Sequence, residues 1–110
     1  QVFTLGGAFD RKWGAFGTGD GEFKSPAGVS VYVDEVFVTD TINHRIQVFT
    51  LGGTFDRKWG SYGSGDGQFN RPWGVSVYGG EVFVTDWRNY RVQVFGVVGK
   101  IQYLPIMGIG

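Results

Sequence analysis

Few side chains in this sequence could perform chemistry. His44 is the single histidine among 110 residues, and the chain contains no cysteine. A catalytic zinc centre normally uses three protein ligands, which one histidine cannot supply, and no arrangement typical of a Ser-His-Asp triad is present. The adjacent carboxylates Asp34 and Glu35 fall in a predicted turn, where we expect water to solvate them. The sequence therefore predicts no catalytic residue, no metal site and no cofactor.

Two glycine-rich segments could be mistaken for phosphate-binding loops. Residues 63–67 read Gly-Ser-Gly-Asp-Gly, and residues 17–21 read Gly-Thr-Gly-Asp-Gly. A phosphate loop is followed by a helix N-terminus, whose amides point at the anion, whereas a strand is predicted after each of these segments. One aspartate is also too few for a calcium loop. Both segments are interpreted as connectors whose glycines adopt positive φ angles.

A group of polar residues occurs twice in the chain. It consists of an aspartate, an asparagine three residues later and an arginine two residues beyond, namely Asp40, Asn43 and Arg45, and again Asp86, Asn89 and Arg91. Short polar side chains in a turn satisfy nearby backbone groups, and the arginine can pair with an aspartate of its own or a neighbouring unit. We expect a structural network rather than a binding site.

The position of these groups is set by a repeat of 46 residues. Residues 1–46 align with residues 47–92 without a gap, and 32 of the 46 positions are identical. A period of this length is typical of proteins built from repeated structural units.

Within each repeat the apolar residues alternate with a period of two. Short runs rich in Val, Phe and Tyr cover residues 28–32, 35–39, 45–49 and 54–59, and turn-forming residues separate them. Alternation of this kind is typical of β-strands, and no helical stripe of useful length exists. Four strands per repeat with glycine-rich joints predict an all-β fold with one four-stranded antiparallel propeller blade per repeat.

Two segments of the chain, one in each copy of the repeat, resemble a known family, the NHL repeats. The resemblance covers about residues 1–106 and is carried by Phe23 and Phe69, Pro26 and Pro72, Gly-Val-Ser-Val at 28–31 and 74–77, Thr-Asp at 39–40 and 85–86, and Asn-His-Arg at 43–45. The second copy departs from the pattern with Tyr90 at the histidine position. The resemblance implies a six-bladed β-propeller and a family that binds proteins or RNA rather than one that performs catalysis.

The repeat phase divides the chain into four parts. Residues 1–14 are expected to be the last two strands of a preceding blade, 15–60 the first repeat, 61–106 the second repeat and 107–110 a tail. A closed propeller has at least four blades, so this chain holds an incomplete ring with open strand edges and an uncovered apolar blade face. We expect completion by copies of the chain or by a longer parent chain. The start at Gln1 rather than at Met suggests an excerpt or a processed product of such a parent.

The best functional clue is the difference between the two repeats. Of the 14 differing positions, ten lie in segments predicted to open on one propeller face. There the second repeat carries large side chains typical of interface hot spots, namely Arg71, Trp73, Trp87, Arg88 and Tyr90. These residues are the predicted binding site. The alternative is that Trp73 and Trp87 fill the seam between blades.

Composition narrows the choice of partner. Ten basic and ten acidic residues give no net charge, which disfavours RNA as the partner without excluding a local basic patch. No apolar run approaches the length of a membrane span, and nothing indicates a cellular location. We therefore predict a non-catalytic binding or scaffold module that associates with itself, with the rest of a longer propeller or with another protein. A structural subunit of a fibre and an RNA-binding fragment are the alternatives, and an enzyme is possible only if other sequence supplies metal ligands.

Overall fold

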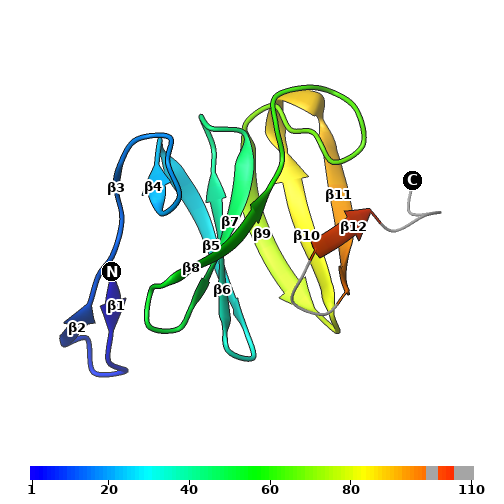
Figure 1. Ribbon diagram of the computed structural model, residues 1–110. Coiled ribbons are helices and arrows are strands. Elements are labelled where there is room, and N and C mark those ends of the chain that lie inside the picture. The colour runs from blue at the N-terminus through cyan, green and yellow to red at the C-terminus, as the bar shows by residue number, and fades with distance from the viewer. Residues whose placement is uncertain (99–101, 106–110) are drawn as a thin grey trace.

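The computed structural model describes residues 1–98 and 102–105. Two four-stranded antiparallel sheets stand side by side, one from each repeat, and a short hairpin lies beside the first sheet (Figure 1). This arrangement confirms the predicted all-β fold of propeller blades that do not close into a ring. We call the two sheets the first and the second blade.

Each blade has its strands in sequence order, so that every strand pairs with the one before it. The first blade contains β5 (Pro26–Tyr32), β6 (Glu35–Asp40), β7 (Arg45–Thr50) and β8 (Phe55–Trp59). The second contains β9 (Pro72–Tyr78), β10 (Glu81–Asp86), β11 (Arg91–Val98) and β12 (Gln102–Pro105). A single-turn 3-10 helix, η1 (Trp87–Asn89), joins β10 to β11 and was not anticipated from the alternating pattern.

The hairpin consists of β1 (Val2–Phe3) and β2 (Phe9–Arg11). In the repeat phase these residues correspond to parts of β7 and β8. Trp13, which follows the hairpin, contacts Phe49 of the first blade at 5.7 Å between ring centroids. Trp59 contacts Phe95 of the second blade in the same way, at 5.4 Å. The hairpin thus stands to the first blade as β7 and β8 stand to the second.

The connectors contain short parallel strand pairs, which the alternating pattern does not predict. β3 (Ala15–Phe16) pairs in parallel with β4 (Glu22–Phe23), and the second connector holds the equivalent parallel bridge between Tyr62 and Phe69. The chain reverses between the paired segments at Gly17 and Gly21, which have φ angles of 155° and 79°. A conformation of this kind is open to glycine but strained for other residues.

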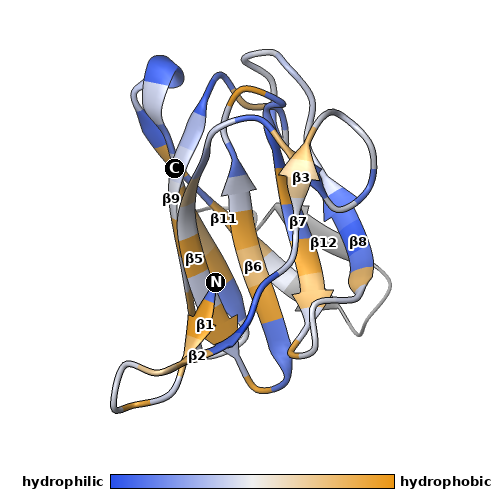
Figure 2. Ribbon diagram, turned by 90° about the vertical axis from the view of Figure 1, so that its left-hand side faces the viewer, coloured by the Kyte–Doolittle hydropathy of each residue, from blue (hydrophilic) through white to orange (hydrophobic). Residues whose placement is uncertain are grey.

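The core lies between the two blades and follows the period of two. In β10, Val82 and Val84 face the first blade and are fully buried, whereas Phe83 between them is 37% exposed. The residues that share this core are Phe37, Ile46, Val48, Phe69, Val82, Val84 and Phe95. Figure 2 shows the hydrophobic stretches along β5 and β6 of the first blade.

The fourth strand of the second blade differs from that of the first. Phe49 pairs with Phe55, whereas its counterpart Phe95 pairs with Pro105. The fourth strand of the second repeat is thus β12, at Gln102–Pro105, and the predicted tail at 107–110 lies outside the described residues. Residues 100–105 carry none of the Thr-Phe-Asp-Arg-Lys-Trp sequence found at 54–59, which explains why the register is not kept.

The turns are distributed over two opposite edges of the blades. One edge, at the top of Figure 1, carries the connectors and the turns between second and third strands. Backbone hydrogen bonds join these segments, for example from Ile42 N–H to the Lys24 carbonyl at 3.0 Å and from Arg88 N–H to the Asn70 carbonyl at 2.9 Å. We call this the connector edge.

Candidate functional site

The predicted binding residues of the second repeat gather on the connector edge. Trp73 lies near the start of β9, Trp87 and Arg88 lie in η1, and Tyr90 follows η1 with a left-handed φ of 54°. The Trp87 N–H donates to the Arg71 carbonyl at 3.2 Å, which holds η1 against the end of the connector. The structure thus brings five residues from two separate segments to one place.

Two indole rings form the centre of this site. The Trp73 and Trp87 rings contact each other edge to face, with centroids 5.5 Å apart, and line a cavity of about 140 Å³. The Arg88 guanidinium lies 4.8 Å from the Trp87 ring centroid, within the range of a cation–π interaction. Trp73 is 54% exposed, Trp87 49% and Tyr90 91%. No blade beyond the second is present among the described residues, so a role of the two tryptophans in a seam with such a blade stays a prediction. We call Trp73, Trp87 and Arg88 the indole cluster.

A buried carboxylate holds η1 and the connector together beneath the indole cluster. Asp86 is fully buried, and its Oδ2 accepts hydrogen bonds from Asn89 and from Arg91 Nε, both at 2.9 Å. Its Oδ1 accepts from the Asn70 N–H at 2.8 Å. Because every bond joins the turn to its own blade or connector, the backbone that carries Trp87 and Arg88 is held in a defined position.

The arginine of each network also binds the glycine-rich connector. Arg91 donates to the carbonyls of Ser64, Gly65 and Gln68 at 2.8–3.0 Å, and Asn89 donates to Gly63 at 2.9 Å. The sequence predicted an Asp–Arg pair, and the connector carbonyls are the partners that it did not indicate. This explains the glycine-rich segment, because its carbonyls must turn toward one guanidinium.

The first blade contains the same network with closer packing. Arg45 donates through Nε to Asp40 at 2.7 Å and through its terminal nitrogens to Thr18, Gly19 and Glu22 carbonyls at 2.9 Å. The Arg45 side chain is 8% exposed, whereas that of Arg91 is 29% exposed. Water therefore reaches the second network more easily.

Sequence reasoning missed one member of each network. Gln47 donates to Asp40 at 3.1 Å and to the Glu22 carbonyl at 2.6 Å, and Gln93 occupies the same place in the second blade. The signal was present, because both glutamines interrupt otherwise apolar strands at identical phase. A fully buried glutamine in a strand requires hydrogen-bond partners.

His44 lies in the seam and has a structural contact. Its Nδ1 accepts a hydrogen bond from the Arg71 N–H at 3.0 Å, and its ring contacts Tyr62 at 4.9 Å between centroids. Burial lowers the pKa of His44 below its ordinary value of 6.5, and the positive charge of Arg71 lowers it further, against a smaller opposing effect of Asp86. The neutral ring is therefore favoured, as an acceptor at Nδ1 requires.

The surroundings of the Glu35 carboxylate differ from those that the sequence predicted. Glu35 was expected to be solvated in a turn, but it begins β6 and forms an ion pair with Arg57 of β8, with side chains 12% and 9% exposed. The pairing arises because β6 and β8 flank β7 in one sheet. Among the described residues, no group of three or more His, Cys, Asp or Glu side chains is placed to hold a metal ion.

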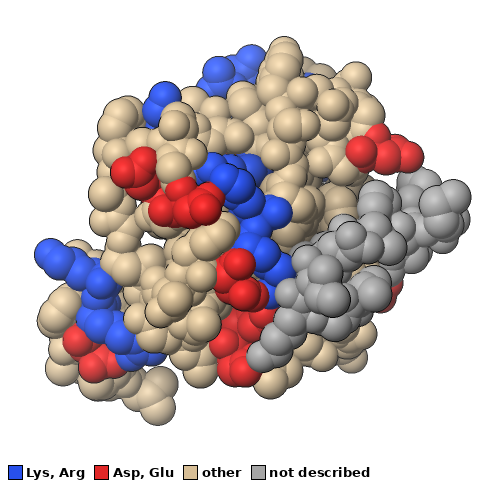
Figure 3. Space-filling view, in the orientation of Figure 1, with Lys and Arg blue, Asp and Glu red and all other residues tan. Residues whose placement is uncertain are grey.

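Charge is mixed on the face of the molecule shown in Figure 3. Figure 3 shows Lys and Arg interspersed with Asp and Glu rather than gathered in one basic patch on the face in view. In the part of the chain that the structure describes, no helix has the length and apolar character needed to span a bilayer.

Comparison with known proteins places the second repeat in a family. Residues 69–95 match the NHL repeat, from Phe69 in the connector to Phe95 in β11. The equivalent segment of the first copy, residues 23–49, is identical to it at 18 of 27 positions. No curated protein matches the chain. The NHL resemblance predicted from sequence is thus confirmed for residues 69–95.

Proposed function

We propose, on the premise that residues 69–95 are an NHL repeat, that this chain is a non-catalytic binding and scaffold module. Its ligand site is the indole cluster with Arg71 and Tyr90 beside it, and its ring of blades is completed by other copies or by a longer parent chain. The single observation that carries the proposal is the exposed aromatic–cation group on a rigid edge.

The comparison of the repeats supports a binding role for this group. Where the second repeat has Trp73, Trp87 and Arg88, the first has Ala27, Thr41 and Ile42. Thr41 is buried and donates to the Pro72 carbonyl at 2.7 Å, so its side chain belongs to the seam. Large half-exposed aromatic residues do not improve the solubility or stability of a monomer, but they are the residues that contribute most to protein interfaces.

A protein is the partner that the surface fits best. Tryptophan and arginine are enriched in the centres of protein interfaces. Single-stranded nucleic acid is bound in a positively charged groove, whereas this chain has no net charge and carries both signs of charge on the face shown in Figure 3. We therefore expect an extended peptide segment to lie across the two indole rings.

The test uses peptides selected from a random displayed library against the whole chain. The double variant Trp87→Ala with Arg88→Ala should weaken binding of the selected peptides at least about tenfold, as expected for loss of hot-spot residues. The matched control is Phe16→Ala with Lys24→Ala, an exposed aromatic–cation pair on the first connector, which should leave affinity within about twofold. Affinity that is unchanged in the first variant, or strong salt-dependent binding of single-stranded RNA, would remove the proposal.

A further inference from the structure

The described residues contain one interface between blades. Elsewhere they contain the first half of that interface without a partner, and the second half covered only in part by the hairpin. From this we infer that a second copy of the chain docks head to tail, with its second blade on the first blade of its neighbour. The inference rests on the proposed function insofar as that function requires other blades to cover this one, and it names the surfaces that meet.

The internal interface shows what each half must provide. From the first blade, Thr39 donates to the Trp73 carbonyl at 2.7 Å and Ser30 accepts from the Val77 N–H at 3.2 Å. Gly28 lies so close that an added Cβ would be 2.8 Å from the Trp73 carbonyl oxygen. Phe37 completes this half and is fully buried.

The second blade carries the same residues on the side that faces away from the first blade. Gly74, Ser76, Phe83 and Thr85 are the in-phase residues and have the same identities, and with Val92 they line an open cavity of about 390 Å³. Phe83 is 37% exposed where Phe37 is 0%, and Val92 is 55% exposed where Ile46 is 0%. We call these five residues the C-side face.

The other half of the internal interface is the valine surface of the second blade. The first blade carries the same valines on the side toward the hairpin. Four valines of the second blade pack against the first blade, namely Val75, Val77, Val82 and Val84. Their in-phase counterparts in the first blade are Val29, Val31, Val36 and Val38. Val29 is 66% and Val31 58% exposed. We call these four valines of the first blade the N-side face.

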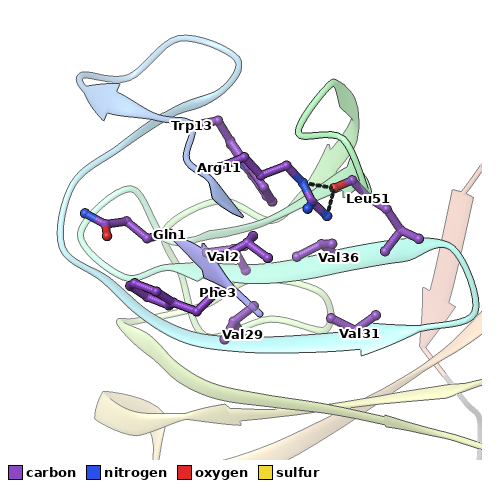
Figure 4. Close-up of a pocket in the computed structure, with 10 residues that line it drawn as sticks. Gln1, Val2, Phe3, Arg11, Trp13, Val29, Val31, Val36 and Leu51 are labelled. Carbon is purple, nitrogen blue, oxygen red and sulfur yellow. Dashed lines mark hydrogen bonds between the residues drawn. The ribbon is translucent and has the colours of Figure 1, made fainter. Parts of the chain in front are cut away.

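The N-side face borders a cavity of about 550 Å³ beneath the hairpin. Figure 4 shows Val29 and Val31 on β5, with Val2 and Phe3 of the hairpin opposite and Arg11 reaching the Leu51 carbonyl. Arg11 donates to this carbonyl at 2.9 and 3.1 Å. The hairpin thus fills the place of third and fourth strands of a preceding blade, and the place of first and second strands stays open. β9 and β10 of a second copy have the sequence that fits this place.

The hairpin also competes with the incoming copy. β11 continues from β10, so a docking second blade brings β11 and β12 to the position that β1 and β2 occupy. The hairpin must therefore move aside, and its contacts through Trp13 and Arg11 oppose association.

Two substitutions at the connector edge make this interface weaker than the internal one. The seam bonds made by Thr41 and His44 have no equivalent, because Trp87 and Tyr90 stand at those positions. The chain has no net charge to oppose association at long range. We expect reversible association that depends on concentration, and head-to-tail contacts that either close into a ring or continue as an array.

Sedimentation equilibrium and mass photometry of the whole chain test the inference. Wild-type protein should form multiples of 12.1 kDa. Phe83→Lys blocks only the C-side face and Val31→Lys blocks only the N-side face, so each variant alone should associate at least about a hundredfold more weakly, because a lysine would be buried without a partner. A mixture of the two should form a one-to-one heterodimer, since each variant keeps the face that the other lacks.

Further variants separate folding from docking. Gly74→Ala should reduce association through the same clash that an alanine at Gly28 would meet, while its circular dichroism spectrum stays that of the wild type. Trp13→Ala should strengthen association several-fold by releasing the hairpin. Peptide binding by the indole cluster is measured in the Phe83→Lys variant, so failure of that site and failure of docking give different results. A monomer at all concentrations, a mixture that stays monomeric or weaker association of Trp13→Ala would overturn the inference.

Discussion

The two blades are near copies in sequence, yet identical residues in them have different surroundings. Phe37 and Phe83 occupy the same position, but the first is fully buried and the second is 37% exposed. Val31 is 58% exposed, whereas Val77 packs against the core between the blades. Burial is thus decided by the neighbouring blade rather than by the residue. The residues that do change between the copies lie mainly on the connector edge, the edge that carries the proposed binding site.

The largest expected effect concerns the two buried networks. Arg45→Met leaves Asp40 buried without a cation, which should lower the free energy of unfolding by about 3–5 kcal/mol. Arg91→Met should cost clearly less, because the Arg91 side chain is 29% exposed and water can solvate Asp86 when it is gone. Urea unfolding followed by tryptophan fluorescence measures both. Equal losses would show that the two networks do not differ in the way their exposure indicates.

A smaller effect is expected at the turn between the first two strands of each blade. Val33 has a φ of 56°, and its counterpart Gly79 has a φ of 58°. A left-handed conformation costs a residue with a Cβ roughly 1–2 kcal/mol, part of which is offset by the greater chain entropy of glycine. Val33→Gly should therefore raise the free energy of unfolding by about 0.5–1 kcal/mol, and Gly79→Val should lower it. Thermal denaturation of both variants measures the effect, and a destabilised Val33→Gly would contradict the assignment of strain.

The smallest effect is the pH dependence of stability that His44 contributes in the seam between the blades. The pKa of His44 is lowered in the folded chain by burial and by Arg71, while the unfolded chain titrates near 6.5. Below 6.5 the unfolded state binds more protons, so the contribution of His44 to stability is complete above this pH and decreases as the pH falls toward the folded pKa. Urea unfolding over a pH series should show this decrease in the wild type. In His44→Asn, where the amide oxygen replaces the acceptor for Arg71, the corresponding part of the slope should vanish; an unchanged slope would assign it to other groups.

Local pattern was enough to predict the main strands of the first blade, although not the short parallel pairs of the connectors. Residues 28–32 and 35–39 alternate clearly, and they lie within Pro26–Tyr32 and Glu35–Asp40. The bonds that hold the connectors could not be predicted in this way, because Arg45 meets the carbonyl of Thr18 across 27 residues of sequence. The ion pair of Glu35 with Arg57 was missed for the same reason, since it joins strands separated by a third.

The candidate site shows the same division. Comparison of the two copies singled out Trp73, Trp87 and Arg88, because each of them replaces a smaller or aliphatic residue of the first copy. That Trp73 and Trp87 contact each other at 5.5 Å between ring centroids required the turn at η1 and the start of β9 to be placed in space. Residues that are polar inside an apolar strand, such as Gln47 and Gln93, were the overlooked signal.

The hydrogen bonds from Arg45 and Arg91 to their own connectors have a consequence for how the chain folds. Each guanidinium reaches carbonyls 23 to 27 residues earlier in the chain, so each repeat closes a loop within itself. Near-identical tandem units are prone to exchanging segments while they fold, and contacts between residues close in sequence form early. During synthesis one unit can therefore complete its internal tether before the next has emerged, which gives every connector a single partner even though two equivalent arginines are present.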